Sequence, residues 1–193
     1  ENWRRLIYQH IFERKHPGVL TGSELTDVRV ELLAGRAHLK HTEGGDFRQA
    51  VYRAIRNGLM YGKSMLLEPI CGFVLRAPAD SYGAIAGALS RMKADVEPPE
   101  YEQDSVILRG EAAYSLFSPW QEEFLRQTHG RGSLRLWMSR YAPCHNEAEI
   151  VEAAAYNPLA DDTPDSVFCA KGAGFTVPWE EVRSYAHLPV KDW

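Results

Sequence analysis

The residues most able to do chemistry lie in the stretch Gly35–Phe47, whose sequence is GRAHLKHTEGGDF. The pattern predicts a strand over 36–42, and a strand directs successive side chains to opposite faces. One face would carry Arg36, His38, Lys40 and Thr42, and the other Ala37, Leu39 and His41. Two interpretations stay open. The basic face either keeps a hairpin edge solvated, or it contacts RNA, because cations pair with phosphates and imidazoles stack on bases.

The elements before this stretch must present it as one arm of a hairpin. Apolar residues at helical spacing predict a helix over 3–11, which Pro17-Gly18 stops. Alternating residues over 25–33 predict a strand that pairs antiparallel with 36–42. Its inward side chains are expected to be Val28, Val30 and Leu32.

A helix is predicted to follow the stretch. Gly44 and Gly45 permit a tight turn, and the carboxylate of Asp46 suits an N-cap that opens the helix. The side chains expected to be buried are Phe47, Ala50, Val51, Ala54 and Ile55. Those expected to be exposed are Arg48, Arg53 and Arg56.

Residues 67–142 predict a second unit of the α+β class. The expected elements are strand 70–77, helix 80–93, an edge strand over 95–102 interrupted by two prolines, strand 105–113, helix 119–128 and strand 133–141. This β-α-β-β-α-β order is that of the ferredoxin-like fold, with four strands and both helices on one face.

Residues 143–193 form an acidic extension. The pattern predicts a short helix over 148–155, an extended segment over 167–177 with a glycine kink, and a final short helix over 179–187. A bend in a strand explains Gly172 and Gly174 better than a ligand loop, because no helix begins directly after them.

Several chemistries are disfavoured by the residue types and their spacing. Gly58–Ser64 (GLMYGKS) is one residue short of a phosphate-binding loop and falls at a helix end. Three distant cysteines fit a reducing cytoplasm, and adjacent Cys144 and His145 are poor metal ligands as a pair. Ser105, Cys71 and Cys144 have no base nearby in the sequence that would make them nucleophiles. No apolar run approaches the roughly 18 residues of a membrane span.

Charge is unevenly distributed along the 193 residues, whose net charge is −4. Residues 1–66 carry 11 Lys and Arg against 7 Asp and Glu, whereas residues 143–193 carry 3 against 9. This gradient predicts that a polyanion meets the N-terminal part only.

Five motifs in register resemble the C-terminal part of elongation factor G, and more closely the tetracycline-resistance ribosomal protection proteins of the TetM type. They are GVLTG at Gly18–Gly22, the TDVRV strand, the Gly35–Phe47 stretch, LLEP at Leu66–Pro69 and T-x-GRGS at Thr128–Ser133. The resemblance implies that residues 1–66 are the second half of a fourth domain and that 67–142 are a ferredoxin-like fifth domain. Residues 143–193 would then pack back on the first unit, and the chain would begin inside a larger protein.

The resemblance also implies a partner and a site. The partner is the ribosome, through rRNA of the decoding region and the large-subunit factor-binding region; neither DNA nor a membrane is expected. His38 matches the histidine that elongation factor G carries there, and Leu39, Lys40 and His41 match a Ser-Pro-Val stretch of the TetM type. Leu-Lys-His is longer and charged, so tetracycline resistance and another ribosome-remodelling role both stay open.

Three further expectations complete this interpretation. Arg131 in the GRGS turn either touches RNA or fixes its loop. The chain contains no GTP-binding motif, so we expect it to be no enzyme by itself, with GTP and Mg bound by a missing N-terminal domain. The alternative is a stand-alone α+β ligand-binding or enzymatic domain, because the fold alone does not decide function.

Overall fold

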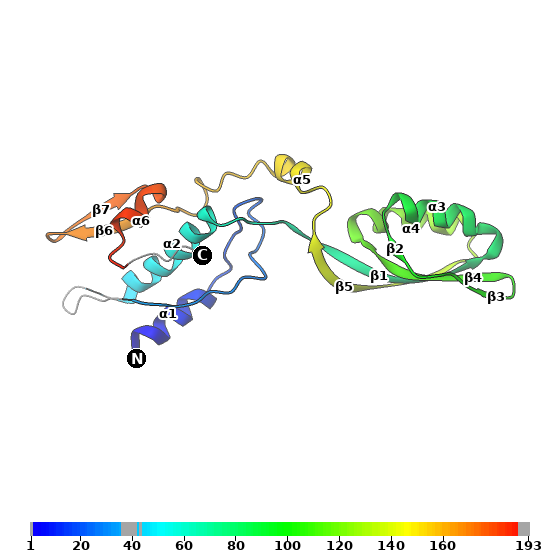
Figure 1. Cartoon of the computed structure of the whole chain (residues 1–193), viewed down its shortest axis with the longest axis horizontal. Coiled ribbons are helices and arrows are strands. Elements are labelled where there is room, and N and C mark those ends of the chain that lie inside the picture. The colour runs from blue at the N-terminus through cyan, green and yellow to red at the C-terminus, as the bar shows by residue number, and fades with distance from the viewer. Residues whose placement is uncertain (1, 36–41, 43, 189–193) are drawn as a thin grey trace. The chain divides into compact units, whose positions relative to one another are not determined.

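The computed structural model describes residues 2–35, 42 and 44–188, and they divide into two compact units (Figure 1). Residues 65–147 form one, here called the ferredoxin-like unit. Residues 1–64 and 148–193 together form the other, here called the discontinuous unit.

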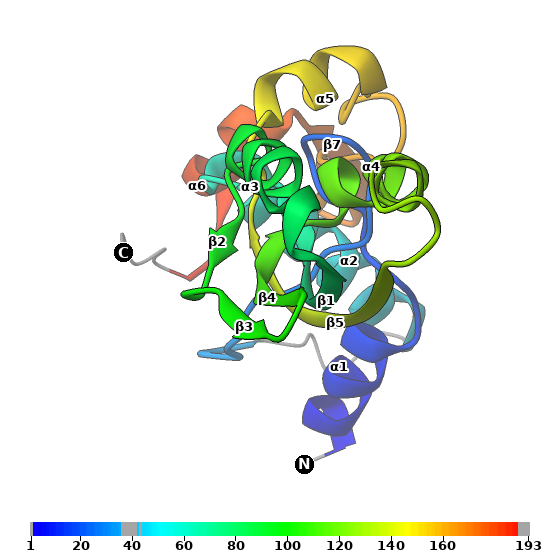
Figure 2. The same cartoon turned by 90° about the vertical axis from the view of Figure 1, so that its right-hand side faces the viewer.

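The ferredoxin-like unit has the predicted α+β architecture. Its elements are β1 (Leu67–Pro78), α3 (Tyr82–Arg91), β2 (Asp95–Val96), β3 (Glu100–Glu102), β4 (Ser105–Ala113), α4 (Tyr114–Gln127) and β5 (Ser133–Pro143). A 3-10 turn, η1 (Ala79–Ser81), precedes α3. The antiparallel sheet has the order β2-β4-β1-β5, with β3 also paired to β4, so the two prolines split one edge strand in two. Figures 1 and 2 show α3 and α4 on the same face of this sheet.

The core of this unit lies between the sheet and its two helices. Phe73 of β1 stacks on Phe117 of α4 with ring centroids 4.9 Å apart, and both side chains are fully buried. Ile85 and Leu89 fill the space from α3. Each such side chain stabilises the fold by roughly 1.5–3 kcal/mol through burial, so this unit has a core of its own.

The boundaries of β1 and α3 differ from the prediction by two or three residues at most ends, and that of α4 by more. Helix α4 begins at Tyr114, five residues before the expected start, and contains Pro119. Proline removes one helical hydrogen bond, but the fully buried Phe117 anchors the first turns against the sheet. Packing therefore overrides the local signal.

The discontinuous unit is built on two helices near the N-terminus. They are α1 (Asn2–Phe12) and α2 (Gly44–Tyr61), and Trp3 stacks on Phe47 between them with centroids 4.4 Å apart. Its C-terminal part contains β6 (Ser166–Ala170), β7 (Ala173–Val177), the 3-10 turn η2 (Trp179–Glu181) and α6 (Val182–Tyr185). Helix α5 (Glu147–Ala154) leads into it from the ferredoxin-like unit.

The predicted first strand of the hairpin is wrong. Residues 25–33 form no strand, and Val28 and Val30 are 50% and 44% exposed. A period of two produces a strand only where a neighbouring backbone accepts its hydrogen bonds. In the described part of the chain, the one bridge near this segment joins Pro17 to Glu24. The predicted second strand, 36–42, lies outside the described residues except for Thr42.

Two other predictions in this unit are corrected. Helix α2 begins at Gly44 and places Asp46 in its first turn, while Ala50 and Ala54 are exposed and Arg56 is buried. The segment 167–177 is a hairpin and not one bent strand, since β6 and β7 pair antiparallel. Its two-residue turn has φ values of 51° and 81° at Lys171 and Gly172, a conformation that suits glycine at the second position.

Candidate functional site

Most of the predicted contact residues cannot be placed. Arg36, His38, Leu39, Lys40 and His41 lie outside the described residues, so their role stays a prediction. Thr42 is half-buried and directly precedes the region where α2 begins. What the structure does show is how α1 and α2, which precede and follow this stretch in the sequence, are fixed to each other.

Glu13, just after α1, joins the two helices through one carboxylate. Its Oε1 accepts hydrogen bonds from Arg48 Nε at 2.8 Å and from the hydroxyl of Tyr52, both on α2. Its Oε2 lies 3.0 Å from Nδ1 of His10, whose side chain is buried. The carboxylate therefore holds the first turns of α2 against the end of α1.

These contacts make Glu13 strongly acidic. The hydrogen bond from Tyr52 is the largest cause, followed by that from His10, and together with Arg48 they lower the pKa of Glu13 from 4.5 to about 2. Burial acts in the opposite direction on this group but is outweighed. Glu13 is consequently ionised in the folded protein over the whole neutral and mildly acidic range.

Arg56 fixes the other end of α2 and was not identified from the sequence. Its side chain is 1% exposed. Its guanidinium donates to the carbonyl oxygens of Pro17 at 2.8 Å and Pro158 at 2.7 Å, and to the Tyr156 hydroxyl at 3.0 Å. A planar fork of donors suits this arrangement, because it meets three acceptors from two separate segments at once.

Three more contacts attach the C-terminal segment to the N-terminal helices. Asn57 donates to the Trp179 carbonyl at 3.0 Å, and Tyr61 donates to the Glu180 carbonyl at 2.7 Å. Arg14 pairs with Asp162 at 2.6 Å. The second half of α2 is thus held by residues more than 100 positions later in the chain.

The attachment of the C-terminal segment to the N-terminal helices weakens the conclusion drawn from the charge gradient along the sequence. The discontinuous unit as a whole has 14 Lys and Arg against 15 Asp and Glu, because the acidic C-terminal segment belongs to the same unit as the basic N-terminal block. A general attraction to polyanions is therefore weaker than the sequence predicted, and a nucleic-acid contact would depend on local cations.

Arg131 lies in the turn between α4 and β5, exposed, with Nη2 3.8 Å from Asp80. Thr128, at the end of α4, fixes the start of this turn. It is fully buried, and its Oγ1 donates a hydrogen bond to the Phe124 carbonyl at 2.9 Å. A side chain at Gly132 would approach Phe124 and Thr128 to 2.7 Å. Packing of Thr128 and Gly132 thus accounts for the shape of this turn, and RNA contact by Arg131 stays a prediction.

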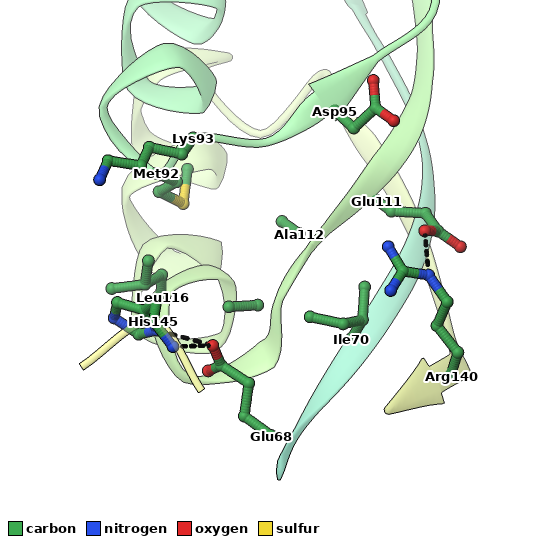
Figure 3. Close-up of a pocket in the computed structure, with 11 residues that line it drawn as sticks. Glu68, Ile70, Met92, Lys93, Asp95, Glu111, Ala112, Leu116, Arg140 and His145 are labelled. Carbon is green, nitrogen blue, oxygen red and sulfur yellow. Dashed lines mark hydrogen bonds and ion pairs between the residues drawn. The ribbon is translucent and has the colours of Figure 1, made fainter. Parts of the chain in front are cut away.

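A second group of polar side chains gathers at one end of the ferredoxin-like sheet (Figure 3). Glu68 accepts hydrogen bonds from the backbone N–H of His145 and lies within bonding distance of its Nδ1, both at 2.8 Å. These residues line one part of a pocket of about 180 Å³, and Arg140 with Glu111 lines another. Burial raises the pKa of Glu68, but the hydrogen bonds from His145 and Ser115 outweigh it and hold the pKa below its ordinary value.

Cys144 lies beside this pair, so Glu68, Cys144 and His145 could together hold a metal ion. The sequence pattern drew attention only to the adjacent Cys144 and His145. Glu68 was missed because it comes 77 residues before His145, and only the pairing of β1 with β5 brings them together.

Comparison with known proteins identifies both units. Residues 2–63 match the family model for elongation factor G, domain IV, and residues 65–150 match that for the elongation factor G C-terminus. Elongation factor G 2 of Pseudoalteromonas translucida (strain TAC 125) is 32% identical over 138 residues, which are 71% of this chain and 20% of that protein. Mitochondrial elongation factor G of Drosophila virilis is 28% identical over 137 residues, 71% of this chain and 18% of that protein.

A solved structure supports the fold. The crystal structure of a protein from Thermus thermophilus superposes on 80% of this chain and 24% of its own, with a TM-score of 0.72 and 22% identity. The matched part of the chain corresponds to about a fifth of the length of the two elongation factors named above.

The architecture is that of a two-unit α+β region whose parts match two neighbouring domains of one factor family. Specifically, the chain is an elongation factor G-like C-terminal region, with a domain IV-like part followed by the C-terminal ferredoxin-like domain. A special closeness to the TetM type is not among these matches. Within the described part of the chain, no helix is long and apolar enough to cross a membrane.

Proposed function

We propose that this chain is the ribosome-binding region of an elongation factor G-like translation factor. The observation that carries the proposal is the consecutive match of residues 2–63 and 65–150 to two neighbouring domains of one factor family. The relatives are named elongation factors, and a factor of that kind acts on the ribosome.

Within this region we propose that residues 36–42 contact rRNA of the decoding region. Lys40 and Arg36 would offset phosphate charge, and His38 and His41 would stack on bases or hydrogen-bond to them. The contacts of Glu13 with Arg48 and Tyr52 support this assignment indirectly, because they fix helix α2, which follows residues 36–42 in the sequence. The near-neutral charge of the whole unit means that binding would depend on these few side chains.

We further propose that the region itself performs no chemistry. The GTP and Mg sites, and with them the hydrolysis of GTP, would belong to another domain of the full-length protein. On this proposal the region works in the cytoplasm as a contact element, and its role in tetracycline protection or in another remodelling step depends on what residues 36–42 touch.

Co-sedimentation of the full-length protein with ribosomes tests the proposal. Wild type is expected to sediment with ribosomes, and the His38→Ala/Lys40→Ala variant is expected to bind at least several-fold more weakly. GTP hydrolysis, measured without ribosomes, should be equal in both and serves as the control for folding. Failure of the wild-type protein to sediment in any nucleotide state would overturn the assignment.

A further inference from the structure

A cluster of three different donor types lies at the end of the ferredoxin-like sheet where β1 begins. Glu68 is the second residue of β1 and pairs with Ala142 of β5. The ladder is extended by a hydrogen bond from the Cys144 N–H to the Leu66 carbonyl at 2.8 Å. Cys144 and His145 therefore leave β5 directly beside the Glu68 carboxylate.

The spacing of these donors is close to that of a metal site. One ligand atom from each residue lies within 4.8 Å of the other two. Around a tetrahedral zinc ion, with bonds of about 2.0–2.3 Å, ligand atoms are about 3.3–3.6 Å apart. Glu68 and His145 are already 2.8 Å apart and would separate slightly around the ion. Cys144 follows the end of β5 and His145 lies on the next turn, so neither side chain is fixed inside the strand.

Burial of Glu68 fixes one donor of the cluster, while Cys144 is half-buried and His145 is exposed. Glu68 is 7% exposed, and its carboxylate is held by His145 and by the Ser115 hydroxyl at 3.2 Å. The thiol of Cys144 points to the amide oxygen of Asn146 at 3.4 Å. The donors are thus partly ordered before any ion arrives, which lowers the cost of binding.

The donor set selects the class of ion. Thiolate and imidazole ligands favour zinc and related transition metals, whereas magnesium and calcium prefer oxygen donors only. We propose that Glu68, Cys144 and His145 bind a zinc ion, with solvent from the adjoining pocket as the fourth ligand. The site would attach the connection after β5 to the first strand of the sheet.

The other charges around the pocket are compatible with a cation. Lys93 and Arg140 are positive, but Arg140 pairs with Glu111 at 2.9 Å, and Asp95 lines the same pocket as Lys93. Figure 3 shows the Arg140–Glu111 pair on the opposite part of the pocket from Glu68 and His145. The charged group nearest to the proposed ion would therefore be the Glu68 carboxylate, and not the Arg140 guanidinium.

Zinc and cobalt titration of the tag-free chain tests this site. The wild type should bind one zinc ion per chain in competition with a chromophoric chelator. With cobalt it should develop the near-ultraviolet absorption of a thiolate-to-cobalt charge transfer. The Cys144→Ser variant should lose that absorption and bind zinc at least about tenfold more weakly. If histidines elsewhere in the chain bound the zinc, the Cys144→Ser variant would bind it as tightly as the wild type, which distinguishes such binding from the proposed site.

Two further variants keep the test decisive. The Cys169→Ser variant, which removes an exposed thiol instead, should behave as wild type. Glu68→Gln should also weaken zinc binding, with its circular dichroism spectrum compared to that of wild type to establish folding. Equal zinc affinity in wild type and Cys144→Ser, or loss of the cobalt absorption in Cys169→Ser, would overturn the proposal without affecting the proposed ribosome binding.

Discussion

The guanidinium of Arg56 donates a hydrogen bond to the carbonyl oxygen of Pro158 at 2.7 Å, across 102 residues of chain. With the carbonyl of Pro17 as a second acceptor, this contact joins three separate segments of the discontinuous unit around one buried side chain. The C-terminal segment beyond residue 150, which neither family model covers, is thereby part of the same unit as the domain IV-like helices.

Replacing Arg56 should destabilise the discontinuous unit strongly. Arg56→Met keeps much of the side-chain volume but leaves both carbonyls without this donor, and hydrogen bonds to a charged group contribute about 1.5–3 kcal/mol each. We expect a loss of at least about 3 kcal/mol, measured by calorimetry, which can follow the two units separately. Arg53→Met on the same helix should lose less than about 1 kcal/mol; an equal loss in both variants would contradict this role for Arg56.

Glu13 should make stability depend on pH in the acid range. The folded pKa of Glu13 is about 2 and its ordinary value is 4.5, so ionised Glu13 stabilises the folded state. That stabilisation is fully present above pH 4.5 and is lost as the pH falls through about 2. Urea midpoints of wild type should therefore decline over this window more steeply than those of Glu13→Gln. Parallel curves for the two proteins would show that the contacts with Tyr52 and His10 do not form.

Two glycines of the ferredoxin-like unit should respond oppositely to alanine. A Cβ at Gly110 would lie 2.2 Å from the Asp95 carbonyl oxygen, and backbone cannot move aside cheaply. Gly110→Ala should therefore cost about 1–3 kcal/mol by disturbing the pairing of β2 with β4. Gly83 in α3 is exposed with nothing within 4 Å of a Cβ, so Gly83→Ala should stabilise by about 0.5–1 kcal/mol. Thermal unfolding of both variants checks the pair, and destabilisation by Gly83→Ala would contradict the described helix.

The thiols of Cys71 and Cys169 should differ in reactivity. Cys71 is buried, its thiol donates to the Ala112 carbonyl at 3.4 Å, and burial raises its pKa. Cys169 is exposed on β6. Alkylation of the native chain should modify Cys169 first and Cys71 only after unfolding, as mass spectrometry of tryptic peptides can determine. Early modification of Cys71 would contradict the described core.

The ferredoxin-like fold could be predicted because its signals are local. Strand 70–77 is a nearly continuous apolar run and strand 133–141 alternates, while the prolines at 98 and 99 mark an edge strand in the sequence as they do in the structure. The start of α4 was displaced the most, because the burial of Phe117 is a property of the whole core.

The discontinuous unit was harder to predict because its contacts are distant in sequence. An arginine on a helix is usually exposed, and nothing near Arg56 in the sequence indicates acceptors at Pro17 and Pro158. The alternation of Val28 and Val30 predicted a strand, but residues 25–33 form none, and alternation by itself does not supply the hydrogen bonds of a sheet. Likewise, the third donor of the candidate zinc site follows from the register of β1 with β5 and from no local motif.

The most direct test of the central claim is the salt dependence of ribosome binding by the full-length protein. Each phosphate contact adds about 0.7–0.9 to the slope of log affinity against log salt concentration. Lys40→Ala should therefore lower the slope by about that amount, whereas Lys63→Ala, which removes an exposed lysine just after α2, should leave it unchanged. Identical slopes for wild type, Lys40→Ala and Lys63→Ala would contradict the assignment of residues 36–42 as an rRNA contact.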